Sequence, residues 1–208
     1  TGVQTCALPI FQVSSDTFFY RLGFEMGIEK IRPYLAEFDF GQQTGIDLPN
    51  EYRGVLPSPE WKEKRFSKLP PERRRWNIAE MVPISIGQGY NAYTPLQMAH
   101  ATATLANNGV VYRPHLVKEL LDHNKQQITL IDPKPQRVLP FKQSNFNYVK
   151  AAMAKVLQPG GTARKIGVGL KYSMGGKTGT AQVVQIAQGK NYNAAALAEQ
   201  HRDHAWFI

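Results

Sequence analysis

A lysine flanked by hydroxyl residues and glycines stands near the carboxyl end of the chain, in the run Gly175 to Val184. Lys177 carries a cation, Thr178 and Thr180 carry hydroxyls, and Gly179 lacks the Cβ that would cover a ligand lying along an extended backbone. An ammonium, hydroxyl groups and a bare backbone on one strand edge can bind a small anion. The run therefore predicts a strand whose edge faces an anionic ligand.

Two other structures could contain the same letters. A Walker A phosphate loop requires Gly-x-x-x-x-Gly-Lys-Thr, so Gly176 and Lys177 would need a glycine at position 171. That position is a lysine, which excludes the phosphate loop. An ordinary strand with a glycine bulge stays open, because three letters alone do not distinguish it from a binding strand.

Ser14 and Asp16 are a second pair of candidates, because they stand just before a helical pattern over residues 18–27. Asp16 or Thr17 could cap this helix by accepting from the N–H groups of its first turn, and a cap alone would account for the polar residues. A second helix is predicted near residues 29–38. Polar side chains at such a place also project from a fixed backbone, so a role in a site stays open.

Charge and composition limit the function classes. The chain has 208 residues, of which 42% are hydrophobic, which is enough for one sizeable core or for part of a larger domain. Its net charge of +9 suits an anionic partner. Much of the excess charge lies between Trp61 and Trp76, and this run predicts a solvated loop. No nucleic-acid-binding motif accompanies the charge, so a nucleic-acid partner is not expected. No apolar run reaches the roughly 20 residues of a membrane span.

Two short motifs are rejected as functional sites. Residues 81–86 predict a short buried strand or an entry segment, and the letters Gly-x-Gly-x-x-Ala follow it at residues 87–92. They lack the acidic residue and the βαβ unit of a dinucleotide site. His201 and His204 are three residues apart, but no second cluster completes a metal site, so a structural or surface role is favoured.

The clearest helix begins at Thr94-Pro95, a cap residue followed by proline, and ends near residues 108–109. Its small residues share one face, which is expected to pack closely in a core: Leu96, Ala99, Ala103 and Ala106. Strand-like pieces are expected within residues 110–121 and 127–131, and another helix over residues 146–157.

Both ends of the sequence carry unusual segments. Residues 1–10 resemble the in-frame translation of a sequencing adapter, so we expect the native segment to be residues 11–208. The single cysteine, Cys6, belongs to that opening, and cysteine usage therefore decides nothing about the compartment. Residues 205–208 form an apolar, strand-like run at the other end. We expect a domain truncated at both ends.

Read together, the motifs follow the order of one protein family. From residue 11 to residue 208 the chain resembles the transpeptidase domain of class B penicillin-binding proteins, and within that class the elongation-specific penicillin-binding protein 2. The motifs that carry the resemblance are, in order, Ser14-Ser15-Asp16, Gly87-Gln88-Gly89 before Thr94-Pro95-Leu96-Gln97, Gly161-Thr162-Ala163 and Lys177-Thr178-Gly179-Thr180. Three further segments are similar to the subgroup, namely residues 44–49, 60–62 and 202–204.

The resemblance implies an α+β fold of the serine β-lactamase and penicillin-binding-protein type, with an antiparallel sheet between helical layers. Residues 177–184 would be the strand that borders the cleft, and residues 205–208 the start of its neighbour. The implied reaction is acyl transfer: a serine attacks the D-Ala-D-Ala amide of a peptidoglycan stem peptide, D-Ala leaves, and an amine of a second stem resolves the acyl-enzyme. β-Lactams imitate the donor peptide, and neither a cofactor nor a metal is implied.

The resemblance also implies roles for the residues around the reacting amide. Ser14 would relay a proton toward the leaving amine, and Lys177 would hold positive potential over the site. Asp16 stands where the family carries an asparagine that bonds the substrate amide. An ionised carboxylate accepts hydrogen bonds but cannot donate them, so this contact differs from the family pattern.

The strand residues receive their roles in the same way. Thr178 and Thr180 would bind the terminal carboxylate of the substrate, and Gly179 would leave room for the peptide along the strand. The backbone N–H of Thr180 would supply half of the oxyanion hole, a role that needs only strand geometry.

Members of this family carry the nucleophile in a Ser-x-x-Lys motif upstream of the position of Ser14, and no serine of this chain is followed by lysine at the third position. We expect the nucleophile and its base in an upstream portion of a longer parent. The resemblance implies a parent in the bacterial inner membrane with its catalytic domain in the periplasm, and a membrane glycosyltransferase and elongation-complex proteins as partners. A catalytically dead penicillin-binding or scaffold module is the alternative.

The isolated chain is expected not to form an acyl-enzyme by the family route, because it has no Ser-x-x-Lys serine. Incubation with a fluorescent penicillin, followed by denaturing electrophoresis, measures this directly. Stable labelling of the chain would contradict the expectation.

Overall fold

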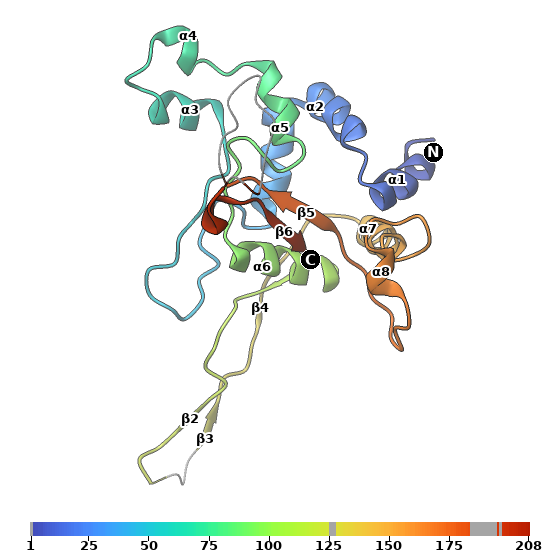
Figure 1. Cartoon of the computed structure of the whole chain (residues 1–208). Helices are drawn as coiled ribbons and strands as arrows, with labels where there is room; N and C mark the ends of the chain where they lie inside the picture. The colour runs from blue at the N-terminus through green and yellow to red at the C-terminus, as the bar shows by residue number, and fades with distance from the viewer. Residues whose placement is uncertain (1, 125–127, 184–194, 196) are drawn as a thin grey trace. The chain divides into compact units, whose positions relative to one another are not determined.

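The computed structural model describes residues 2–124, 128–183, 195 and 197–208 (Figure 1). The chain forms two compact units: a terminal unit of Thr1–Phe18 with Val149–Ile208, and a central unit of Phe19–Tyr148. The helices are α1 Gly2–Val13, α2 Asp16–Glu37, α3 Pro59–Arg65, α4 Pro71–Arg74, the 3₁₀ turn η1 Ile78–Glu80, α5 Met81–Ile84, α6 Pro95–Ala106, α7 Gln143–Lys155, α8 Arg164–Gly167 and the 3₁₀ turn η3 Glu199–His201. The strands are β1 Val110–Tyr112, β2 Glu119–Leu121, β3 Ile128–Leu130, β4 Pro135–Val138, β5 Thr178–Ala181 and β6 His204–Phe207.

The described strands form three antiparallel pairs, β1 with β4, β2 with β3, and β5 with β6. The pair β5–β6 confirms, within the described residues, the two neighbouring strands predicted at residues 177–184 and 205–208. Val184 lies outside the described residues. Strands are also present in the surface segments where the sequence predicts them, since β1 and β2 fall within residues 110–121 and β3 within residues 127–131.

Helix α2 contains the two helices predicted from the sequence. Gly27 interrupts it with φ 69° and ψ 169°, a conformation that residues with a side chain rarely adopt. The helix begins at Asp16 itself, so Asp16 is its first residue and not a cap that precedes it. A carboxylate in the first turn is favourable there because the N-terminal N–H groups carry partial positive charge.

Helix α6 begins with the cap that the sequence predicts. The Thr94 hydroxyl accepts from the Gln97 N–H, and the Gln97 side chain accepts from the Thr94 N–H. Gln97 also donates to the carbonyls of Gln42 and Arg53, at 2.6 and 2.9 Å, and is buried. Gln97 therefore connects the start of the helix to the loop that precedes α3.

The predicted core face of α6 is wrong. Three of its four residues, Ala99, Ala103 and Ala106, are exposed. The buried face carries Gln97, His100, Ala101 and Thr104. The hydrogen bonds of Gln97 direct its side of the helix inward, and the helical period then selects the positions three, four and seven residues further on.

The buried strand predicted at residues 81–86 is wrong as well, because this segment is helical. Asn77 and Glu80 form a reciprocal cap that starts the 3₁₀ turn η1, and α5 continues from it. Met81 and Ile84 are three residues apart on one face of that helix, and both are buried against Ile28. A short apolar run fits either structure, and the cap ahead of it decides for the helix.

The basic run between Trp61 and Trp76 differs from the predicted loop, because most of α3 and all of α4 lie within it. Most of its charged residues are exposed, but Lys62 retains only 4% of its exposure. The Lys62 ammonium donates to the Glu80 carboxylate and to the carbonyl of Arg75. A buried charge is tolerated only when it is paired in this way.

Replacement of Lys62 is expected to destabilise the chain because it leaves the Glu80 carboxylate without its cation. Lys62→Ala should lower the free energy of unfolding by about 2 kcal/mol. Urea denaturation at pH 7 measures the change. The control, Lys64→Ala on the exposed side of the same helix, should change it by less than about 0.5 kcal/mol. Equal effects of the two substitutions would contradict the buried ion pair.

The core of the terminal unit lies between the end of α7 and β6. Val156, Leu157 and Ala163 are buried there, with Phe11 and Phe207 among the residues packed against them. The turn after α7 places Ala163 in the core through its N–H bond to the Val156 carbonyl at 3.0 Å. This core joins α1, the turn after α7 and strand β6, and the segment before β5 packs against it through Leu170 and Met174.

Candidate active site

Ser14 lies in the tight turn between α1 and α2. Its φ is +55°, a left-handed conformation that is uncommon for a residue with a side chain. The Ser14 N–H donates to the Phe11 carbonyl at 3.3 Å, and the Ser15 N–H donates to the Ile10 carbonyl at 3.0 Å. These bonds use carbonyls at the end of α1 and hold the turn, so the position of Ser14 is set by the backbone.

The Lys177 side chain reaches this turn from the other end of the chain. Its Nζ donates to the Ser14 Oγ at 2.8 Å and to the Thr178 carbonyl at 2.7 Å. The ammonium also lies 5.9 Å from the centre of the Phe11 ring, within the range of a cation–π contact. Residues from the two predicted motifs are therefore in direct contact, although 163 positions separate them.

The lysine is half-buried, and burial lowers the pKa of the Lys177 ammonium from its usual value. The negative charge of Asp16 opposes this effect and raises the pKa. An ammonium can only donate hydrogen bonds, so in this contact the Ser14 oxygen is the acceptor. The hydroxyl proton of Ser14 is therefore free to donate to another atom.

Strand β5 presents one edge to β6 and the other edge outward. The Lys177 N–H donates to the Ile208 carbonyl at 2.8 Å, and the Ile208 N–H donates to the Lys177 carbonyl at 3.1 Å. Antiparallel strands alternate such bonded pairs with unbonded ones, so the N–H groups of Thr178 and Thr180 point away from β6. No described strand pairs with that outer edge.

Thr162 is a site residue to which the sequence assigned no role. Its Oγ1 lies 2.9 Å from the Oγ1 of Thr178, and its N–H donates to the Gln12 carbonyl at 3.2 Å. The Gln12 side chain in turn donates to the Pro159 carbonyl at 2.9 Å. The only sequence signal for Thr162 was the place of Gly161-Thr162-Ala163 in the order of motifs.

The predicted site residues are thus brought together to different degrees. Ser14, Lys177 and Thr178 are linked by hydrogen bonds, and Thr180 follows on the same outer edge of β5. Asp16 is exposed on the first turn of α2 and acts on Lys177 through its charge. A Cβ at Gly179 would meet only the Trp206 Cβ, at 3.9 Å, so the packing of the described protein does not itself require glycine there.

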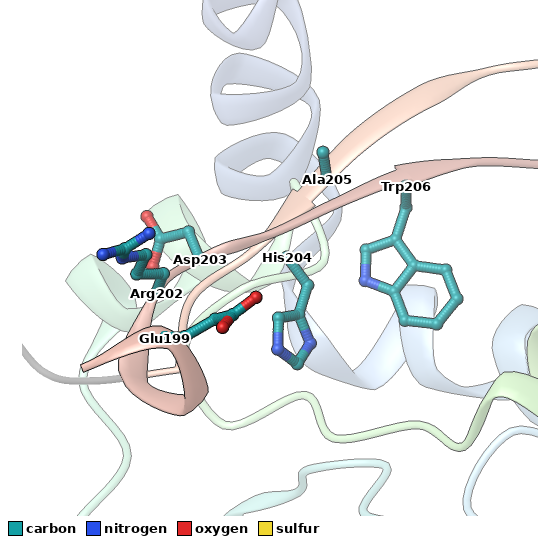
Figure 2. Close-up of a pocket in the computed structure, with 6 residues that line it drawn as sticks. All are labelled: Glu199, Arg202, Asp203, His204, Ala205 and Trp206. Atoms are coloured by element: carbon teal, nitrogen blue, oxygen red, sulfur yellow. The ribbon is translucent and has the colours of Figure 1, made fainter. Parts of the chain in front are cut away.

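The two histidines noted in the sequence lie at the end of η3, His201, and at the start of β6, His204. Figure 2 shows a hollow there, with His204 and Trp206 projecting from one face of the β6 ribbon and Ala205 from the other. Among the described residues, no three His, Cys, Asp or Glu side chains are grouped closely enough to hold a metal ion. No described helix is both long enough and apolar enough to cross a bilayer.

Residues 5–208 match the family model of the penicillin-binding protein transpeptidase domain. The chain belongs to the penicillin-binding protein transpeptidase family. This confirms the family predicted from the motifs and, with the solved structures below, the α+β fold of that family. The match begins within residues 1–10, for which an adapter origin stays a prediction.

Curated relatives and solved structures of this family are similar over nearly the whole chain. Peptidoglycan D,D-transpeptidase MrdA of Acinetobacter baumannii is 42% identical over 198 residues, which cover 94% of this chain and 28% of the relative. MrdA of Escherichia coli K12 is 38% identical over 192 residues, which cover 92% of this chain and 29% of the relative. The chain therefore spans less than a third of the length of these curated relatives.

Two solved penicillin-binding proteins have the same fold. PBP2 of Helicobacter pylori, in a complex with MreC, is similar with a TM-score of 0.74 and 32% identity, over 96% of this chain and 32% of that one. PBP2 of Pseudomonas aeruginosa, in complex with WCK 5153, is similar with a TM-score of 0.71 and 36% identity, over 93% of this chain and 38% of that one.

The charge of Asp16 is expected to influence the titration of the Lys177 ammonium. Asp16→Asn removes a charge that favours the ammonium, so the pKa of Lys177 should fall further below its usual value. NMR titration of the lysine Cε signals, assigned by comparison with Lys177→Arg, measures the shift. The control, Asp132→Asn, removes an exposed carboxylate of the central unit and should leave the Lys177 signal unchanged. A Lys177 pKa that does not respond to Asp16→Asn would contradict the coupling.

Proposed function

We propose that this chain is the carboxyl-terminal part of the transpeptidase domain of a serine D,D-transpeptidase. The enzyme cross-links peptidoglycan stem peptides during cell elongation and is acylated by β-lactams. The observation that carries the proposal is the 2.8 Å hydrogen bond from Lys177 Nζ to Ser14 Oγ, which joins the two family motifs into one site. The relatives named peptidoglycan D,D-transpeptidase support the same reaction.

Ser14 is proposed to carry the proton in acyl transfer. The nucleophilic serine, which belongs to a Ser-x-x-Lys segment outside this sequence, attacks the carbonyl carbon of the D-Ala-D-Ala amide. As the C–N bond breaks, Ser14 donates its hydroxyl proton to the leaving nitrogen and takes up the proton that the nucleophile released. Lys177 supports this step, because its ammonium donates to the Ser14 oxygen and so leaves the proton of Ser14 available to the substrate.

The outer edge of β5 is proposed to bind the peptide. The Thr180 N–H points away from β6 and can donate to the oxygen on which negative charge develops. The hydroxyls of Thr178 and Thr180 would bind the terminal carboxylate of the substrate. Thr162 supports this arrangement because its contact with the Thr178 hydroxyl fixes where that group lies.

The wider setting of the enzyme is proposed from its relatives. A similar PBP2 of Helicobacter pylori forms a complex with MreC, which supports an elongation-complex partner for the full-length protein. We place the parent in the bacterial inner membrane with this domain in the periplasm, next to a membrane glycosyltransferase. Peptidoglycan stem peptides and β-lactams are its ligands, and neither nucleic acid nor a cofactor takes part in the proposal.

The full-length protein that contains this segment tests the function. Its second-order rate of acylation by a fluorescent penicillin should fall about a hundredfold or more in Ser14→Ala and in Lys177→Met, because each removes a group that positions or transfers the proton. The matched control is Ser15→Ala, one position along the same turn, which should remain within about twofold of the wild type. Thermal unfolding of every variant separates lost chemistry from lost fold.

Three results would overturn the proposal. A full-length protein without any Ser-x-x-Lys serine, or one that no penicillin acylates, would be the penicillin-binding or scaffold module without catalysis. Equal rates of acylation in Ser14→Ala and Ser15→Ala would show that Ser14 does not transfer the proton.

A further inference from the structure

His100, on the inward face of α6, is a buried histidine whose ring is held by no hydrogen bond in the described part of the chain. The residue retains 5% of its exposure, and both ring nitrogens lack a hydrogen-bond partner among the described residues. A neutral imidazole carries one N–H donor and one acceptor nitrogen, so burial leaves both groups unsatisfied. Such groups are rare in folded proteins, and this one points to a role beyond packing.

A carboxylate and a guanidinium stand next to this ring. The His100 Nε2 lies 3.5 Å from Asp39 Oδ2, which is longer than a usual hydrogen bond. The other carboxylate oxygen of Asp39 accepts from Arg137 Nη2 at 2.8 Å, and Arg137 also donates to the Glu37 carbonyl at 2.7 Å. Asp39 therefore already has its cation, and the imidazole lies just beyond bonding distance of the same carboxylate.

Three separate parts of the central unit bring these groups together. Asp39 follows α2 in a left-handed turn, with φ 62° and its N–H bonded to the Ala36 carbonyl at 3.0 Å. Arg137 lies on β4, and His100 lies on α6. The same parts of the chain also meet in one hydrophobic core, to which each contributes an apolar residue: Phe38, Leu105 and Leu139. A change in the charge of His100 therefore acts on a contact among three parts of the fold.

The surroundings of His100 keep its ring neutral at pH 7. Burial lowers the pKa of the imidazole from its usual value, the carboxylates of Asp39 and Glu51 raise it, and the Arg137 cation lowers it. The net direction is downward. Asp39 comes from the turn after α2, Glu51 from the loop before α3 and Arg137 from β4, while α6 itself contains no other ionisable side chain. The buried ring therefore resists a proton that a hydrated ring would accept.

We propose that His100 is an acid sensor of the central unit: uptake of a proton by its imidazole opens the contact that joins α6 to the turn after α2 and to β4. In the closed form the ring is neutral and dry, and in the opened form water hydrates the imidazolium. Gln97 lies one turn earlier on the same face of α6 and bonds to the carbonyls of Gln42 and Arg53, so the opening also reaches the loop before α3. This role concerns the fold of the central unit and does not depend on the proposed function.

The opened form binds the proton more tightly than the closed form, and this sets the sign of the pH effect. A hydrated imidazole has a pKa of about 6.5, and the buried ring has a lower one, so the opened form carries more protons between these two values. The closed form is therefore fully stable above about pH 6.5 and loses stability as the pH falls toward the pKa of the buried ring. One proton per opening event changes the opening equilibrium by at most about tenfold per pH unit.

Hydrogen–deuterium exchange of the full-length protein, followed by mass spectrometry of peptides that cover Pro95–Ala106, measures the opening of α6. The wild type is compared with His100→Gln at the same pH, which cancels the pH dependence of the exchange chemistry itself. Below about pH 6.5 the ratio of the wild-type rate to the variant rate should rise by up to about tenfold per pH unit, and above it the ratio should stay constant. The matched control is His123→Gln, an exposed histidine of the same unit, which should keep the pH dependence of the wild type.

A second variant makes the test independent of whether His100→Gln folds. Arg137→Gln removes the cation that lowers the pKa of His100, so that pKa should rise toward about 6.5 and the acid-induced exchange of α6 should weaken. Equal pH dependence in the wild type and His100→Gln would overturn the sensor, and so would its loss in His123→Gln. Where His100→Gln is already unfolded at neutral pH, Arg137→Gln decides: a weaker pH dependence than that of the wild type supports the sensor, and an unchanged or stronger one overturns it.

Discussion

The half-buried ammonium of Lys177 imposes the main constraint on the terminal unit, because a desolvated cation must be surrounded by acceptors. The structure supplies them from separate places: the hydroxyl of Ser14, the carbonyl of Thr178, and the face of the Phe11 ring. Each acceptor has its own support. Ser14 is fixed by the turn after α1, and Thr178 by the antiparallel pair of β5 with β6. The chemistry proposed for the site depends on this convergence.

Close approach of backbones makes the convergence possible. A Cβ at Gly161 would lie 2.1 Å from the Val156 carbonyl oxygen, and a Cβ at Gly176 would lie 2.3 Å from the Phe207 ring. Neither space can hold a side chain, so these two glycines permit the turn after α7 and the start of β5 to pack where they do. Gly179 is different, since its Cβ would meet little of the described protein. That open space is consistent with a ligand along the strand.

The cationic side chains of this protein fall into two groups, those withdrawn from water and those exposed to it. Lys62 and Lys177 are partly or fully withdrawn from water and are held by specific partners, Glu80 and Ser14. Arg164 and Lys165 are exposed and form no ion pairs in the described part of the chain. The net charge of +9 alone does not distinguish these roles. Burial and partners do, because solvent screens the exposed charges and not the buried ones.

The sequence alone determined the features that depend on near neighbours. It predicted the cap and the end of α6, the break between the two halves of α2, the strand at Thr178, and the motif order that identifies the family. Caps, glycines and strand patterns act over a few residues, so the local letters are sufficient. They also supplied the candidates Ser14 and Lys177, through the types of chemistry that these residues can perform.

Only the tertiary structure decided which distant residues meet. It buried Lys62, chose the Gln97 face of α6 in place of the alanine face, and brought Thr162 to Thr178. Each of these outcomes depends on a partner from elsewhere in the chain. The free energy of burial and of hydrogen bonding is set by such partners, and the local sequence carries no record of their positions.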